Sequence, residues 1–217
     1  MVSDRPIELD QCVRGLKSTG GGGWLGASPG VEQSDFRIID EYVVFAVALP
    51  SYDETLTVFP LPFGRIAAAL TFEDRDRAGR SWPHTHVLIA SEYDYRKTIR
   101  GNPFVLVRNG LLHRQHVPST ELGTVTLDPS QADTEDKWPG GAAELLPDSG
   151  WEDAITCILE KRRVYLFTRD FPIEDRHRLF EALVLSLPVA DRCTFYFATC
   201  MFSPREKPQN GQQVADT

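Results

Sequence analysis

The sequence predicts an α+β fold, in which a mostly antiparallel sheet is covered by helices and begins with an N-terminal β-hairpin. Segments of strand length fill most of the first half of the chain, whereas helical spacing appears mainly in the second half. Strands that come first and helices that come later are typical of α+β folds. The 217 residues, 41% of them hydrophobic, are enough for one buried core.

The hairpin is predicted from two short segments on either side of a glycine run. Residues 7–16 alternate roughly between apolar and polar side chains, and residues 24–27 form a second short strand. The glycines at 20–23 then make the tip between them. A phosphate-binding loop would end in Gly-Lys-Ser or Gly-Lys-Thr, but Trp24 follows the last glycine. We therefore expect a hairpin tip and not a phosphate loop.

The middle of the chain predicts the body of the sheet. Apolar segments of strand length follow at residues 42–49, 56–60, 65–72 and 85–90. Ser91 is a favoured N-cap residue, and it predicts a short helix through Ile99. Residues 104–107 fit either a strand or the start of a loop.

The last third of the chain predicts alternating helices and strands. Residues 129–150 are rich in Asp, Pro and Gly, which indicates a long loop or insertion. The helices are expected at residues 151–162 and 173–187, and the strands at residues 164–167 and 193–198. Pro188 ends the second helix. We expect one globular domain over residues 1–202 and a polar, disordered tail over residues 203–217.

Charge and cysteine content narrow the classes of function. The 31 acidic residues against 23 basic ones give a net charge of −8, which repels a phosphate backbone, so nucleic acid is not an expected partner. The four cysteines form no Cys-x-x-Cys pair, which favours free thiols in a reducing compartment. The N-terminus lacks an apolar signal segment, and no apolar run is long enough to span a bilayer. We expect a cytoplasmic protein without a membrane partner.

Four histidines carry the clearest chemical hypothesis. His84 and His86 are two residues apart, which places both side chains on one face of a strand. His113 and His116 are three apart, which suits one face of a helical turn. Four imidazoles could bind zinc in a tetrahedron, and the chain would then be a metal-dependent enzyme. The alternative is that hydrogen bonds within the protein satisfy these histidines, and no cofactor is then expected.

Other signatures of catalysis are incomplete. The chain has no Gly-x-Ser-x-Gly and no His-Glu-x-x-His, so no catalytic residue is assigned and enzymatic activity is not the expectation. A third hypothesis is a sensor of a nucleotide or small ligand. It would use the glycine turn together with Arg14, Lys17 or Arg80.

Three groups of segments carry a resemblance to a known family. The first runs from Leu9-Asp10-Gln11-Cys12 through the glycine turn to Trp24-Leu25-Gly26-Ala27-Ser28-Pro29-Gly30. The second consists of Asp76-Arg77-Ala78-Gly79-Arg80, Pro83-His84-Thr85-His86-Val87-Leu88-Ile89 and Asn102-Pro103-Phe104. The third is Leu187-Pro188-Val189-Ala190-Asp191-Arg192 with Thr194-Phe195-Tyr196-Phe197-Ala198-Thr199. Taken in order, these segments resemble the N-terminal domain of the bacterial GTPase-associated protein family.

The resemblance implies a role in the multi-component systems of biological conflict, including phage defence, in which that family is found. It favours a non-catalytic adaptor module with a protein partner, for which a GTPase is the candidate. Partner contacts are expected on exposed loops. Arg80, which closes a turn, and Arg192, which we expect to be exposed near Pro188, are the predicted partner-binding residues.

Overall fold

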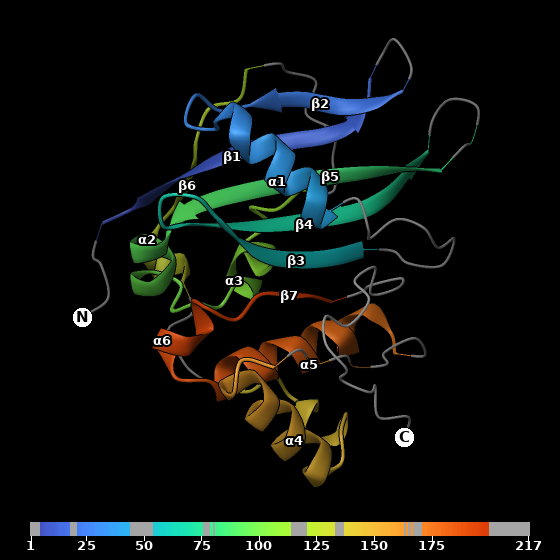
Figure 1. Ribbon diagram of the computed structural model, residues 1–217, viewed down its shortest axis with the longest axis vertical. Coiled ribbons are helices and arrows are strands. Elements are labelled where there is room, and N and C mark those ends of the chain that lie inside the picture. The colour runs from blue at the N-terminus through green and yellow to red at the C-terminus, as the bar shows by residue number, and fades with distance from the viewer. Residues whose placement is uncertain are drawn as a thin grey trace.

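The computed structural model describes residues 5–17, 21–43, 54–75, 79, 81–113, 121–132, 137–162, 164, 166 and 171–199. It confirms the α+β class: a seven-stranded sheet whose strand pairings are antiparallel is accompanied by helices (Figure 1). The strand order is β2-β1-β5-β4-β3-β7, with β6 paired to β1 beside this path.

The described strands and helices have the following bounds. The strands are β1 (Ile7–Leu16), β2 (Gly22–Ala27), β3 (Glu54–Leu61), β4 (Arg65–Arg75), β5 (Ser81–Ser91), β6 (Val125–Leu127) and β7 (Phe197–Ala198). The helices are α1 (Gln33–Val43), α2 (Glu92–Lys97), α3 (Phe104–Arg108), α4 (Asp148–Leu159), α5 (Ile173–Ser186) and α6 (Val189–Arg192). Two short 3-10 helices, η2 (Pro129–Gln131) and η3 (Ala142–Glu144), interrupt the region expected to be a long loop.

The predicted N-terminal hairpin is formed by β1 and β2. The backbone N–H of Lys17 donates to the carbonyl of Gly21 at 3.0 Å and closes the turn. Glycine is required in the strands as well as at the tip. A Cβ on Gly22 would lie 2.2 Å from the indole of Trp82, because that ring crosses the backbone there.

Helices cover the two faces of the sheet differently. On the front face, Ile39 and Val43 of α1 pack against Phe59, Val87 and Ile89 of the sheet, and α1 crosses the near side in Figure 1. On the back face, a larger core contains residues of α2, α3 and α5, including Tyr95, Phe104, Phe180 and Val184. Beyond the β7 edge, α5 and α4 pack on each other around Trp151, Leu179 and Leu183 (Figure 1).

The helices at residues 91–99, 151–162 and 173–187 were predicted with the correct type and nearly correct ends. Ser91 is the N-cap of α2, because its Oγ accepts a hydrogen bond from the Asp94 N–H at 3.0 Å. Both α4 and α5 follow a proline, at Pro147 and Pro172, which fits the fixed φ of proline at a helix start. None of the described helices is long and apolar enough to span a membrane.

Two segments differ from their predictions: residues 104–107, expected to be a strand or the start of a loop, and residues 193–198, expected to be a strand throughout. Residues 104–107 belong to helix α3, whose first N–H groups are oriented by Asn102, since the Phe104 N–H donates to Asn102 Oδ1 at 3.1 Å. Of residues 193–198, only Phe197 and Ala198 pair with the sheet. The residues before them follow directly on α6, whose C-cap is Cys193, and lie in the turn after it.

The strand predicted at residues 42–49 was wrong at its first two residues, which are helical. Tyr42 and Val43 are the last residues of α1, and residues 44–49 lie outside the described part. Most of residues 164–167 and the whole tail at 203–217 also lie outside it.

Candidate functional site

The two histidines of β5 point to the same face of the sheet, as predicted. They share the back face with Leu88 and Ala90, and each is only 1% exposed. Burial of polar rings costs free energy unless their nitrogens find partners. The contacts of His86 show how this cost is met.

His86 is the centre of a hydrogen-bond chain. Its Nδ1 accepts from the backbone N–H of His113 at 2.9 Å, so in a neutral ring Nε2 carries the proton. Nε2 then donates to Oε1 of Gln11 at 3.0 Å. The Gln11 amide nitrogen donates in turn to the carbonyl of Gly123 at 2.7 Å. His86 therefore ties β5 to β1 and to the segments that contain His113 and Gly123.

The environment of His86 keeps its ring neutral. Its pKa is lowered to about 3, mainly by burial and with smaller contributions from His113 and His84. Burial dominates because an imidazolium loses more hydration than a neutral ring. A neutral imidazole with both nitrogens engaged is suited to a structural role.

His84 occupies a cradle formed by a neighbouring ring and a glycine. Its ring lies 4.8 Å from that of Phe72, centroid to centroid, on the paired strand β4. A Cβ on Gly15 would lie 2.8 Å from His84 Nδ1, so only glycine leaves room for this ring on β1. The sequence pattern placed His84 on the correct face but did not indicate this packing.

The structure describes three of the four predicted zinc ligands, His84, His86 and His113. His86 uses both nitrogens within the protein, and the rings of His86 and His113 stack with centroids 5.3 Å apart at an interplanar angle of 9°. Stacked parallel rings do not direct their nitrogens to one tetrahedral centre. Among the described residues, no three His, Cys, Asp or Glu side chains could hold a metal ion. His116 lies outside the described residues, so its part in the prediction stays untested.

The expectation that Arg192 is exposed was wrong, because its side chain caps the end of α5. Only 4% of the residue is accessible. Its Nε donates to the Leu187 carbonyl at 2.8 Å, and Nη2 donates to the Leu185 carbonyl at 2.9 Å. The last carbonyls of a helix have no partner within the helix, and a buried arginine supplies several donors. Arg80, the other predicted contact, lies outside the described residues.

Of the residues of the sensor hypothesis, the structure describes Arg14 and Lys17. Arg14 forms an ion pair with Asp40 of α1, at 2.8 Å between Nε and Oδ1, and Lys17 lies over Gly23. A cavity of about 10 Å³ lies in the back-face core beside Leu9, Leu88 and Tyr95, away from the glycine turn. It is apolar and about large enough for one water.

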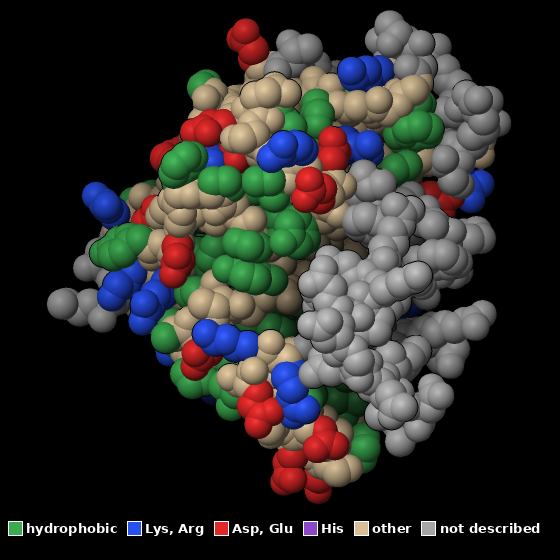
Figure 2. All heavy atoms as spheres, viewed as in Figure 1, with side chains coloured by type: hydrophobic (Ala, Val, Ile, Leu, Met, Phe, Trp, Pro, Cys, Tyr) green, Lys and Arg blue, Asp and Glu red, His purple; other side chains and the backbone are tan. Residues whose placement is uncertain are grey.

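A different surface stands out, and the sequence pattern did not predict it. Four exposed aromatic side chains come from separate segments: the end of α1, the β3–β4 turn, the start of α2 and the residues before β7. We call Tyr42, Phe63, Tyr93 and Tyr196 the aromatic surface; they are 43%, 83%, 62% and 41% exposed. Figure 2 shows hydrophobic side chains gathered beneath α1, over β3 and β4.

Contacts between the segments bring these residues together. The Glu92 N–H donates to the Gly64 carbonyl at 2.7 Å, which joins the start of α2, and so Tyr93, to the turn that carries Phe63. Burial raises the pKa of Tyr196, and the nearby charges of Glu92, Cys193 and Tyr42 add to the rise. Glu92, at the start of α2, and Tyr42, at the end of α1, are therefore both near Tyr196. The ring of Tyr42 stacks on Phe59, with centroids 4.6 Å apart.

Phe63 breaks two rules of local structure at once. Its φ is 61°, in the left-handed region, where a bulky residue costs about 1–2 kcal/mol relative to glycine. Its side chain is also the most exposed of the large hydrophobic residues described. Residues that break local rules without a structural gain are concentrated at functional sites. The Pro62-Phe63-Gly64 sequence is the signal that could have indicated it.

Comparisons of the chain with protein-family models, curated proteins and solved structures find no match.

Proposed function

We propose that this chain is a non-catalytic protein-interaction module, an adaptor in a bacterial multi-protein conflict system. The resemblance to the GTPase-associated family supports the type of system and makes a GTPase the partner to test first. The binding surface is the aromatic surface of Tyr42, Phe63, Tyr93 and Tyr196. Phe63 is the observation that carries the proposal.

The chemistry of this surface supports protein binding. Aromatic side chains are enriched in protein interfaces, and a few of them supply most of the binding free energy. A turn held between two paired strands loses little further backbone freedom when a partner covers it. Phe63 meets this description, because its ring is 83% exposed and its backbone is held between β3 and β4.

Two buried polar residues, His86 and Arg192, support the same proposal, because both form hydrogen bonds within the protein. His86 donates to Gln11 and accepts from the His113 N–H. Arg192 binds carbonyls at the end of α5. Their geometry accounts for histidine and arginine at these positions without any reaction.

The test is affinity purification from the native host, followed by mass spectrometry, with three forms of the chain. The wild type is expected to recover a reproducible partner, with a GTPase as the first candidate. Phe63→Asn, whose side chain tolerates the left-handed backbone, is expected to lose that partner. Leu159→Asn is the control, because Leu159 is a 49% exposed hydrophobic residue on α4. Equal recovery by wild type and Phe63→Asn would contradict the proposal.

A further inference from the structure

We infer that the partner meets the aromatic surface with an acidic protein segment that carries its own apolar side chains. The inference rests on the proposed function and specifies the chemistry of the partner. It follows from the charges placed beside Tyr93 on α2. The helix ends in two basic residues, Arg96 and Lys97, and both are exposed.

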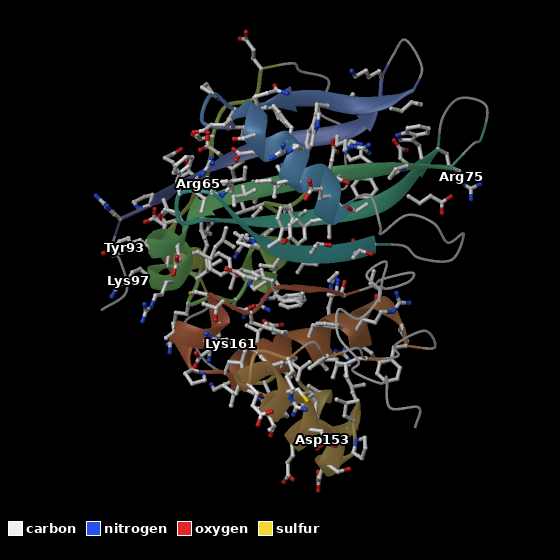
Figure 3. The ribbon with its side chains drawn as sticks, viewed as in Figure 1. Arg65, Arg75, Tyr93, Lys97, Asp153 and Lys161 are labelled. Atoms are coloured by element: carbon white, nitrogen blue, oxygen red, sulfur yellow. The ribbon has the colours of Figure 1, made fainter. Side chains whose placement is uncertain are left out.

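Helix geometry places these charges next to the aromatic side chains. Tyr93 and Lys97 are four residues apart and Tyr93 and Arg96 three apart, so they are neighbours on the helix surface. In Figure 3, Tyr93 and Lys97 project outward from the same end of the molecule. Arg96 and Glu92 both influence the Cys193 thiol, whose pKa is raised to about 11 mainly by burial. Arg96 therefore lies near Cys193, which is three residues before Tyr196.

The two acidic residues of α2 equal the two basic ones in number, but they lie toward its start and the basic ones at its end. Asp94 accepts from the Ser91 N-cap hydroxyl at 2.6 Å, and Ser91 accepts in turn from the Asp94 N–H. Glu92 is at the opposite end of the helix from Lys97. The result is a basic end on α2 in a chain whose net charge is −8.

The contrast between the basic end of α2 and the acidic chain favours one orientation and one chemistry for the partner. An acidic segment is repelled by the net charge of the chain and attracted by Arg96 and Lys97, so charge favours the orientation that brings it to the aromatic surface. Arginine and lysine flanking exposed rings provide ion pairs at the rim and apolar contact at the centre. An acidic peptide with apolar side chains matches both features.

The first experiment measures fluorescence anisotropy of a labelled random copolymer of glutamate and tyrosine with the full chain. Wild type is expected to bind it, with affinity falling as salt rises. Arg96→Glu with Lys97→Glu is expected to weaken binding by about tenfold or more. The charge-matched control is Arg75→Glu with Arg162→Glu, at exposed sites away from α2, and a change within about twofold is expected. Figure 3 shows Arg75 at the opposite end of the molecule from Tyr93.

Several outcomes would overturn the inference. They are no binding of the copolymer, equal binding by the Arg96→Glu/Lys97→Glu variant, or binding of oligothymidylate or phosphatidylserine vesicles in its place. The last result would assign the basic end to nucleic acid or to a lipid surface.

A second experiment separates this inference from the proposed function. Purification from the host is repeated with the Arg96→Glu/Lys97→Glu variant and with Phe63→Asn. Failure of the inference and failure of the proposed function then give different results. Loss of the partner only with Phe63→Asn would reject the acidic segment and retain the interaction surface. Full recovery with both variants would reject the proposed function itself.

Discussion

The backbone N–H of His113 donates to Nδ1 of His86 at 2.9 Å, and this bond determines which nitrogen of His86 carries the proton. The same ring donates to Gln11, whose amide reaches Gly123. One buried histidine thus connects two strands with segments on either side of residues 114–120. We expect this connection to be a large contributor to stability.

Replacement of His86 by Ala should lower the free energy of unfolding by about 2–4 kcal/mol, because it leaves a cavity and removes two hydrogen bonds. His113→Ala keeps the backbone donor and removes only a ring that stacks on His86, so a loss below about 1 kcal/mol is expected. Urea unfolding followed by circular dichroism measures both values. Similar losses for the two variants would show that the backbone bond is not the important contact.

The low pKa of His86 predicts an acid-dependent loss of stability. The pKa falls from 6.5 to about 3 on folding, so between these values the unfolded chain binds a proton that the folded chain does not. The contribution is complete above pH 6.5 and decreases as pH falls, with a slope of up to about 1.4 kcal/mol per pH unit. His86→Gln should remove this part of the slope. Unfolding at a series of pH values tests it, and identical slopes for both proteins would contradict the assignment.

Gly15→Ala should be destabilising by about 1–3 kcal/mol, because the new methyl group would lie 2.8 Å from His84 Nδ1 and 3.0 Å from Leu25. Gly140→Ala is the matched control, since a Cβ there meets nothing within 4 Å. It should be neutral or slightly stabilising. Thermal unfolding of the two variants distinguishes a packing requirement at Gly15 from a general effect of replacing glycine.

Arg192→Ala should cost about 2–4 kcal/mol, because it leaves the carbonyls of Leu185 and Leu187 without their donor. Arg178→Ala removes an arginine from the same region whose side chain is 49% exposed and paired with Asp175. A surface pair of this kind contributes less than about 1 kcal/mol. A stable Arg192→Ala protein that has lost its partner would instead support the original prediction of a binding role.

Phe63→Asn should keep or raise the free energy of unfolding by up to about 1 kcal/mol, since Asn tolerates a φ of 61° better than Phe. The same substitution is expected to weaken partner binding. Denaturant unfolding measures the change in the free energy of unfolding. A marked loss of stability would mean that Phe63 is kept for the fold and not for binding.

Alternation along strands and helical periodicity were sufficient to predict the fold class. The period of two placed His84 and His86 on one face, and Ser91 correctly marked the start of α2. Helix α1 was missed although Phe36, Ile39 and Val43 follow helical spacing, because the apolar residues near its end were assigned to a strand. Helix α3 is buried through its first three residues, so its short sequence carries no periodicity to distinguish helix from strand.

The candidate site was less predictable, because it depends on contacts between distant segments. Nothing near Arg192 in the sequence indicates that its guanidinium turns back onto the end of α5. The aromatic surface combines residues from position 42 to position 196, and exposure of a tyrosine is a property of the folded chain. Only Phe63, beside Pro62 and Gly64 in a turn, had a local signal.

Photocrosslinking in the native host tests the central proposal most directly. A chain in which Tyr93 is replaced by p-benzoylphenylalanine is compared with one that carries the same group at Leu159 on α4. The proposed function predicts a discrete covalent adduct with one partner protein from position 93 and none from position 159. Adducts from position 159 alone, or the same adducts from both positions, would contradict an interaction surface built around Phe63 and Tyr93.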